Sequence, residues 1–207
     1  MNPRPIVVVL AAGRGSRFHL SRHKLAQSLA GSTVLGTTLR NAVASQLGVV
    51  VVVTQALADE ARHYVAARDV VVLPEVGSDG RLPLGMGFSI ANGVSARPDA
   101  SGWLVLPGDM PMVRSDTLRA VAQALSQHPV AYAQHLGRRG HPVGFGSELY
   151  SELVKLSGDE GARRLVARYP AQGVEVDDPG VLVDVDTESD LALLRGAHGG
   201  GETAQRA

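Results

Sequence analysis

Short apolar runs rich in valine, isoleucine and leucine recur along the chain, separated by segments with helical spacing. Six runs have the length and composition of β-strands, at residues 5–10, 49–54, 70–73, 103–106, 130–134 and 181–185. Several are almost continuously apolar, as strands that are covered on both faces must be. The pattern therefore predicts an α/β fold in which a mostly parallel sheet lies between helical layers.

The intervening segments place apolar residues three and four positions apart, as amphipathic helices do. One predicted helix follows Thr33 and ends at Gly48, with an apolar face made of Leu35, Leu39, Val43 and Leu47. Ser115 is predicted to cap a second helix. Further helices are predicted at residues 57–67, 88–94, 147–156, 160–168 and 188–194.

The length and composition limit the possible classes of protein. A chain of 207 residues is long enough for one buried core, and its last residues are small, polar and glycine-rich. We therefore predict a single domain over residues 1–196 and a flexible tail over residues 197–207. No apolar run approaches the ~18 residues of a membrane span, and the first apolar run is too short for a signal peptide. We expect a cytoplasmic protein without a membrane partner.

Charge and cysteine content exclude further classes. Lys and Arg together number 20, as do Asp and Glu, so no broad positive field is available to hold nucleic acid. The absence of cysteine excludes disulfides, thiolate metal sites and a cysteine nucleophile. The available chemistry rests on Asp, Glu, His, Lys, Arg and a bound metal ion.

The sequence Leu-Ala-Ala-Gly-Arg-Gly-Ser-Arg at residues 10–17 follows the first predicted strand directly. Small residues let backbone N–H groups approach phosphate oxygens, and Arg17 and Lys24 add positive charge suited to a triphosphate. The alternative is a tight turn with two solvated cations. The spacing does not match a P-loop, and Phe18 replaces the third glycine of a dinucleotide-binding loop, which disfavours a nicotinamide-dependent oxidoreductase.

Carboxylates follow two other predicted strands. Asp109 lies in Gly-Asp-Met-Pro after the strand at 103–106, where it could hold Mg²⁺ or cap a turn before Pro111. Alternation places Asp184 and Asp186 on one side of the strand at 181–185. Either is a candidate second metal ligand; the alternative is that Asp186 or Thr187 caps the last helix.

Three glycine-rich segments complete the set of candidate loops. Residues 77–89 form a long loop ending in Gly85-Met-Gly-Phe-Ser89 at a predicted helix start, which suits an anion or is an ordinary capped loop. Residues 137–143 and 157–163 supply Arg139, His141 and Arg163, which suit an anionic acceptor or are simply solvated.

These elements, in this order, resemble the nucleotidyltransferases of the MobA/MocA type, which transfer a nucleotide to molybdopterin. The resemblance covers roughly residues 5–194. It implies a three-layer Rossmann-like sandwich of the nucleotide-diphospho-sugar transferase type. The sequence departs from the family pattern at Phe18-His19 and has two additional residues before Lys24.

The resemblance also implies roles for individual residues. It assigns nucleotide binding to Leu10, Ala11, Ala12, Gly13, Gly15, Arg17, Lys24, Gly85, Gly87 and Ser89. It assigns catalysis to Arg17, Lys24 and Asp109, metal binding to Asp109 and Asp186, and binding of the acceptor substrate to Arg139, His141 and Arg163. The two alanines before Gly13 resemble the cytidylyltransferase branch and therefore favour CTP.

The expected reaction is magnesium-dependent transfer of CMP from CTP to the phosphate of molybdopterin cofactor, with release of pyrophosphate. A molybdoenzyme or its chaperone is a candidate partner. Two alternatives stay open: a nucleotidyltransferase that uses GTP, a sugar phosphate or another phosphorylated acceptor, and a non-catalytic protein that binds and delivers a pterin cofactor.

Overall fold

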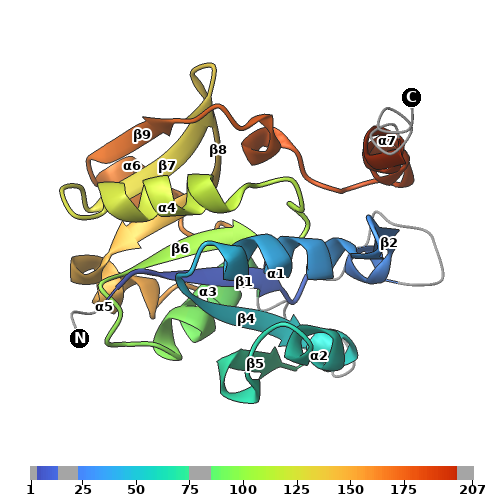
Figure 1. The fold of residues 1–207 in the computed structure, drawn as a ribbon. Helices are drawn as coiled ribbons and strands as arrows, with labels where there is room; N and C mark the ends of the chain where they lie inside the picture. Colours follow the sequence, from blue (N-terminus) through green and yellow to red (C-terminus); the bar gives the residue numbers. More distant parts are fainter. Residues whose placement is uncertain (1–3, 14–22, 75–84, 200–207) are drawn as a thin grey trace.

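A seven-stranded sheet forms the centre of the molecule (Figure 1). The structure, a computed structural model, describes residues 4–13, 23–74 and 85–199. The strand order in the sheet is β5-β4-β1-β6-β8-β7-β9. The strands are β1 (Ile6–Ala11), β4 (Gly48–Thr54), β5 (Val70–Leu73), β6 (Gly102–Pro107), β7 (Val130–His135), β8 (Arg138–Gly146) and β9 (Ala171–Glu175). A separate small hairpin joins β2 (Ser28–Leu29) to β3 (Ser32–Thr33).

The sheet is mostly parallel. β1 pairs in parallel with β4 and β6, β4 with β5, and β7 with β9. β8 is antiparallel to both of its neighbours, β6 and β7, and is the one reversed strand of the described sheet. The predicted α/β class with a mostly parallel sheet is therefore confirmed.

Helices cover both faces of the sheet. Alternate residues of β1 point to opposite faces: Val7 and Val9 join a core with α1 (Val34–Ala44), α2 (Gln55–Arg62) and α4 (Ser115–Ala124). Ile6 and Val8 join a second core with α3 (Gly85–Ser95), α5 (Tyr150–Leu153) and α6 (Arg163–Arg168). The short 3-10 helices are η1 (Lys24–Ala26), η2 (Ala67–Asp69), η3 (Ser147–Leu149) and η4 (Pro179–Leu182).

The last helix, α7 (Glu188–Gly199), lies beside the β2–β3 hairpin (Figure 1). Arg195 Nε donates to the Ser28 carbonyl at 2.9 Å, which ties the end of the chain to a segment near its beginning. The helix extends three residues into the predicted tail at 197–207. Residues 200–207 lie outside the described part, so the domain boundary stays a prediction.

The predicted strand at 181–185 is wrong. Residues 179–182 form η4, and residues 183–186 have no regular structure. The Asp178 side chain accepts from Gly180 N at 3.1 Å and Pro179 begins the helix, so the chain turns here instead of extending. Val181 and Val185 are fully buried by packing in the first core, which produces their apolar alternation without a strand.

Besides the two short strands of the β2–β3 hairpin, two strands of the seven-stranded sheet were not predicted, β8 and β9. Residues 137–143 read as a loop because glycine and proline are poor strand formers. β8 nevertheless pairs along both edges, with β6 and β7, so the neighbouring strands impose its extended conformation. β9 is half-exposed and pairs with β7 at the edge of the sheet, and it lacks a strong apolar signal.

The start of α4 also differs from the prediction, because Arg114 occupies the cap position and Ser115 is the first helical residue. The cap is supplied from far along the chain: the Asp178 carboxylate accepts from Arg114 N at 2.8 Å and from the Thr117 hydroxyl at 2.6 Å. No helix of the described chain is long and apolar enough to cross a bilayer.

Candidate active site

The carboxyl ends of β1 and β6 lie side by side and position the turn that carries Asp109. Gly108 N donates to the Leu10 carbonyl at 2.8 Å, and the buried Thr38 hydroxyl donates to the Gly108 carbonyl at 2.9 Å. A Cβ at residue 108 would lie 3.0 Å from the Leu10 oxygen, so glycine permits this close approach. Strand ends at the centre of an open α/β sheet are where such folds bind ligands.

Lys24 and two carboxylates meet at these strand ends. Lys24 Nζ lies 2.6 Å from Asp109 Oδ2 and 2.9 Å from Asp186 Oδ1. The Lys24 side chain is 13% exposed, and those of Asp109 and Asp186 are 18% and 31% exposed. Burial opposes the ammonium form, but the charges and hydrogen bonds of the two carboxylates prevail and raise the pKa of Lys24. Lys24 is therefore a cation throughout the neutral pH range.

His23 fixes the backbone on which Lys24 stands. Its Nδ1 accepts from Leu25 N at 3.3 Å, which caps η1, and its Nε2 lies 2.8 Å from the Gly13 carbonyl. With Nδ1 acting as the acceptor, Nε2 carries the proton and donates to Gly13. One side chain thus ties the start of the glycine loop to the turn that carries Lys24.

The segment that carries Asp186 is held at both ends. Val185 N donates to the Asp109 carbonyl at 2.9 Å, which aligns the segment with the turn after β6. The side-chain cap of α7 comes from Thr187 and Asp190: the Asp190 carboxylate accepts from Thr187 N at 2.7 Å, and Asp190 N donates to the Thr187 hydroxyl at 3.2 Å. The Asp186 carboxylate meanwhile accepts from Lys24.

The carboxylates fit a divalent cation that is bound by protein carboxylates on one side and by nucleotide phosphates on the other. Asp109 Oδ1 is buried and has no hydrogen-bond partner in the described structure. Burial and the charge of Asp186 raise the pKa of Asp184, which lies in the same pocket. In the described chain no three His, Asp or Glu side chains form a complete metal cage. Mg²⁺ needs no such cage, since it binds through one or two carboxylates together with phosphate oxygens and water.

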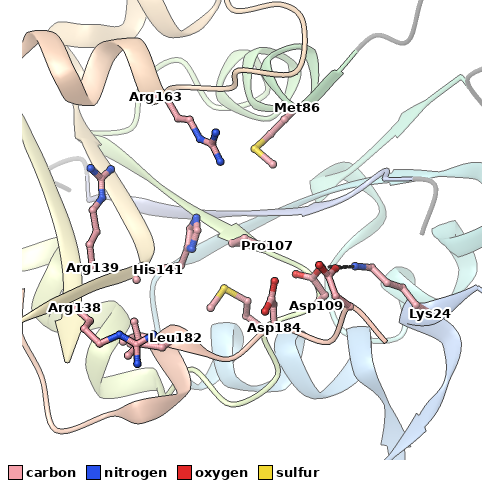
Figure 2. Close-up of a pocket in the computed structure, with 14 residues that line it drawn as sticks. Lys24, Met86, Pro107, Asp109, Arg138, Arg139, His141, Arg163, Leu182 and Asp184 are labelled. Carbon is pink, nitrogen blue, oxygen red and sulfur yellow. Dashed lines mark hydrogen bonds and ion pairs between the residues drawn. The ribbon is translucent and has the colours of Figure 1, made fainter. Parts of the chain in front are cut away.

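The pocket around this cluster has a volume of about 590 Å³ and carries both signs of charge. Figure 2 shows Lys24, Asp109 and Asp184 at one end and Arg139, His141 and Arg163 away from them. Burial lowers the pKa of His141, and the charge of Arg139 lowers it further, against the opposing effect of Asp109. His141 is consequently a neutral imidazole at pH 7.

The structure brings most of the predicted polar site residues into this one pocket. They are Lys24, Asp109, Asp186, Arg139, His141 and Arg163, which come from five separate stretches of sequence. Leu10, Ala11, Ala12 and Gly13 lie at the end of β1 and directly after it. Gly15 and Arg17 lie outside the described residues.

Gly85 and Gly87 have a packing role in addition to the predicted binding role. Gly85 has φ +73°, and a Cβ there would lie 2.2 Å from the backbone carbon of Gly158. A Cβ on Gly87 would lie 2.7 Å from the Ser157 oxygen, and Gly87 N donates to the Gly158 carbonyl at 2.9 Å. α3 therefore starts at Gly85, within the predicted loop at 77–89, and Ser89 lies one turn into the helix.

Several pocket residues were not predicted from the sequence. They are Met86, Pro107, Met110, Arg138, Gly140, Val181 and Leu182. Arg138 and Met86 are sequence neighbours of predicted site residues, and this proximity was the one signal by which they could have been predicted. The apolar pocket residues had no such signal, because apolar residues that line a pocket are of the same types as those buried in a core. Asp184, weighed against Asp186, lines the pocket together with it.

The chain is similar to known proteins over most of its length. The family described as MobA-like NTP transferase domain matches residues 7–176. The purine catabolism protein PucB of Bacillus subtilis is 32% identical over 216 residues, covering 95% of this chain and 98% of that protein.

Solved structures with the same fold include Rv0371c of Mycobacterium tuberculosis H37Rv, at 29% identity and a TM-score of 0.80 over 95% of this chain and 99% of that one. The same protein has been solved in complex with manganese, at 28% identity and a TM-score of 0.74 over 94% and 99% of the two chains. Molybdopterin-guanine dinucleotide biosynthesis protein A of Archaeoglobus fulgidus shares the fold at 16% identity, with a TM-score of 0.67 over 94% and 98%.

Proposed function

The chain belongs to the MobA-like NTP transferase family, and from that premise we propose that it transfers CMP from CTP to the phosphate of molybdopterin cofactor. The transfer depends on Mg²⁺ and releases pyrophosphate. The observation that carries the proposal is the convergence of Lys24, Asp109 and Asp186 at the adjoining ends of β1 and β6. A cation and two carboxylates at this place suit a metal-bound triphosphate.

The reaction needs positioning and charge neutralisation more than covalent chemistry. A phosphate oxygen of the acceptor forms a bond to the α-phosphorus of the nucleotide. The bond from that phosphorus to the oxygen bridging to the β-phosphorus breaks, and pyrophosphate leaves with the electron pair. The acceptor phosphate is itself the nucleophile, so no side chain is needed to activate a hydroxyl or thiol.

Each part of the pocket has a function in this scheme. Asp109 and Asp186 would hold Mg²⁺, and the ion would supply positive charge beside the triphosphate. Lys24, and Arg17 from the glycine loop, stabilise the negative charge of the phosphates. Arg139, His141 and Arg163 would bind the acceptor at the opposite side of the pocket. The manganese complex of Rv0371c supports a divalent metal in this fold.

The choice of base and acceptor rests on two lines of support. The two alanines before Gly13 resemble the cytidylyltransferase branch, which favours CTP. The family match and the order of the motifs favour a phosphorylated pterin acceptor. The product would be passed to a molybdoenzyme or to its chaperone. Transfer of GMP, or transfer to another phosphorylated acceptor, uses the same metal site and differs in the loops around it.

The test is acceptor-dependent release of pyrophosphate. The purified protein is incubated with Mg²⁺, molybdopterin cofactor and each of CTP, GTP, ATP and UTP in turn, and pyrophosphate is measured for the wild type and Asp109→Asn. Asp59→Asn is the matched control, because Asp59 is an exposed carboxylate on α2. We expect release with CTP that requires the acceptor, persists in Asp59→Asn and falls by at least a hundredfold in Asp109→Asn.

Other outcomes would change the proposal in defined ways. Acceptor-dependent release with GTP would keep the reaction and replace the nucleotide. No release with any nucleotide, together with tight binding of molybdopterin cofactor, would overturn catalysis in favour of a binding and delivery protein.

A further inference from the structure

The two candidate metal ligands lie on two separate segments of the chain. Residues 109–114 connect β6 to α4 and begin with Asp109, and residues 178–186 lie between β9 and α7 and end with Asp186. Both segments line the pocket shown in Figure 2. At the carboxylate end they are joined by the hydrogen bond from Val185 N to the Asp109 carbonyl, at 2.9 Å. The distance between the two carboxylates therefore depends on how one segment is held against the other.

At the opposite end the segments are joined by the side chain of Asp178, which is 2% exposed. Its Oδ2 accepts from Arg114 N at 2.8 Å and from the Thr117 hydroxyl at 2.6 Å, and both of these donors belong to the start of α4 and the residue before it. Its Oδ1 accepts from Gly180 N at 3.1 Å, within its own segment. Each carboxylate oxygen thus holds a different one of the two segments.

Between these two ends the backbones touch. A Cβ on Gly180 would overlap the carbonyl oxygen of Met112, so glycine permits this approach. On the other side of η4, a Cβ on Gly140 of β8 would overlap the carbonyl oxygen of Val181. From one end to the other, the contacts pair rising positions of the first segment with falling positions of the second. The two segments are therefore antiparallel, and η4 is packed tightly between the first segment and β8.

We propose that Asp178 is a positioning residue for the divalent cation, an inference that rests on the metal site of the proposed function. By holding the two segments in one register, its carboxylate sets the distance between Asp109 and Asp186. It acts from outside the pocket, whose lining does not include it. Mg²⁺ demands near-ideal ligand geometry, so a small shift of one segment against the other weakens binding. The cap of α4 and the geometry of the metal site are thus determined by the same buried side chain.

The test disturbs the register in two independent ways. Asp178→Asn keeps the shape of the side chain, but its amide nitrogen cannot accept, so one segment loses its acceptor whichever way the amide is turned. Gly180→Ala leaves Asp178 intact and forces the segments apart at Met112. Thr117→Val is the matched control, because it removes a donor on α4 alone and keeps the bonds from Arg114 N and Gly180 N. Mn²⁺ affinity without nucleotide, urea unfolding without metal, far-UV circular dichroism and pyrophosphate release are measured for each variant.

We expect folded Asp178→Asn and Gly180→Ala to bind Mn²⁺ about tenfold more weakly than the wild type. Thr117→Val should be less stable to urea yet bind Mn²⁺ as the wild type does. Wild-type Mn²⁺ affinity in both folded register variants, or an equal loss in Thr117→Val, would overturn the inference, because the role of Asp178 would then be structural alone. The expected pattern of Mn²⁺ affinities without any pyrophosphate release by the wild type would instead overturn the proposed transfer and leave the positioning role standing.

Discussion

Replacing Lys24 by methionine should tighten the binding of a divalent cation in the absence of nucleotide. Methionine keeps the length and the apolar stem of the side chain and removes its charge. The Lys24 ammonium now contacts Asp109 and Asp186, the same carboxylates proposed to hold the metal. Metal binding in the wild type must therefore displace this ammonium, and the variant removes that competition.

The expected size of the effect follows from burial. Breaking a fully buried ion pair costs about 3–5 kcal/mol, and an exposed pair contributes about 1 kcal/mol or less. The three side chains are 13%, 18% and 31% exposed, which places this cluster between those limits, at about 1–3 kcal/mol. Metal affinity should accordingly rise by about 5- to 150-fold, and the free energy of unfolding without metal should fall by a similar energy.

Electron paramagnetic resonance of free Mn²⁺ measures the affinity directly. Lys155→Met is the matched control, because Lys155 is an exposed lysine that does not line the pocket. The pKa of Lys24 is higher in the folded than in the unfolded protein. The stabilisation by its charge is therefore fully present below the unfolded-state pKa and is lost only as the pH rises through the higher folded-state pKa. The difference between variant and wild type should thus be constant from pH 6 to 9.

The reasoning also predicts opposite effects on two measurements. Lys24→Met should bind Mn²⁺ more tightly yet release pyrophosphate at least tenfold more slowly, because the triphosphate loses its cation. Mn²⁺ affinity equal to or lower than that of the wild type would refute the competition, whatever happens to activity.

Three further outcomes are expected. Burial lowers the pKa of His141, so the unfolded state binds more protons as pH falls below about 6.5 and stability is lost there; urea unfolding of His141→Gln should show a flatter pH dependence between pH 7 and 5. The pKa of Asp184 is raised in the folded protein, so its ionised form destabilises the fold at neutral pH. This destabilisation disappears as the pH falls through the folded-state pKa and the carboxylate is protonated. Asp184→Asn should therefore be slightly more stable than the wild type at pH 7 and equally stable at pH 3, with a lower Mn²⁺ affinity; the gain is small because Asp184 is exposed and solvent screens its charge. Gly85→Ala should cost about 2–4 kcal/mol because its Cβ meets the Gly158 backbone; Gly137→Ala, at φ +72° with open space around it, should cost about 1–2 kcal/mol in the same thermal unfolding assay.

The sequence by itself was enough to predict the fold class and to single out Asp109, the carboxylate after the central strand. Continuous runs of valine such as residues 49–53 favour a strand covered on both faces, so the parallel sheet and its helical layers could be predicted from the local pattern. Asp109 was found because its motif directly follows such a strand. These features depend on neighbours in sequence, which the sequence displays.

Tertiary structure alone decided the features that depend on distant neighbours. β8 is extended because β6 and β7 pair with it, although its glycines and proline oppose a strand. Asp178 caps a helix that begins more than sixty residues earlier, so Ser115 was wrongly predicted as its cap.

The site shows the same division. Lys24, Asp109 and Asp186 were each marked by a motif, but their contact spans 85 and 162 positions and exists only in the folded chain. A second hollow of about 380 Å³, between α3, α6 and the sheet, could not be predicted from the sequence at all. Its valines, isoleucine and phenylalanine are ordinary core residues, and only the packing of α3 and α6 against the sheet determines that a space remains between them.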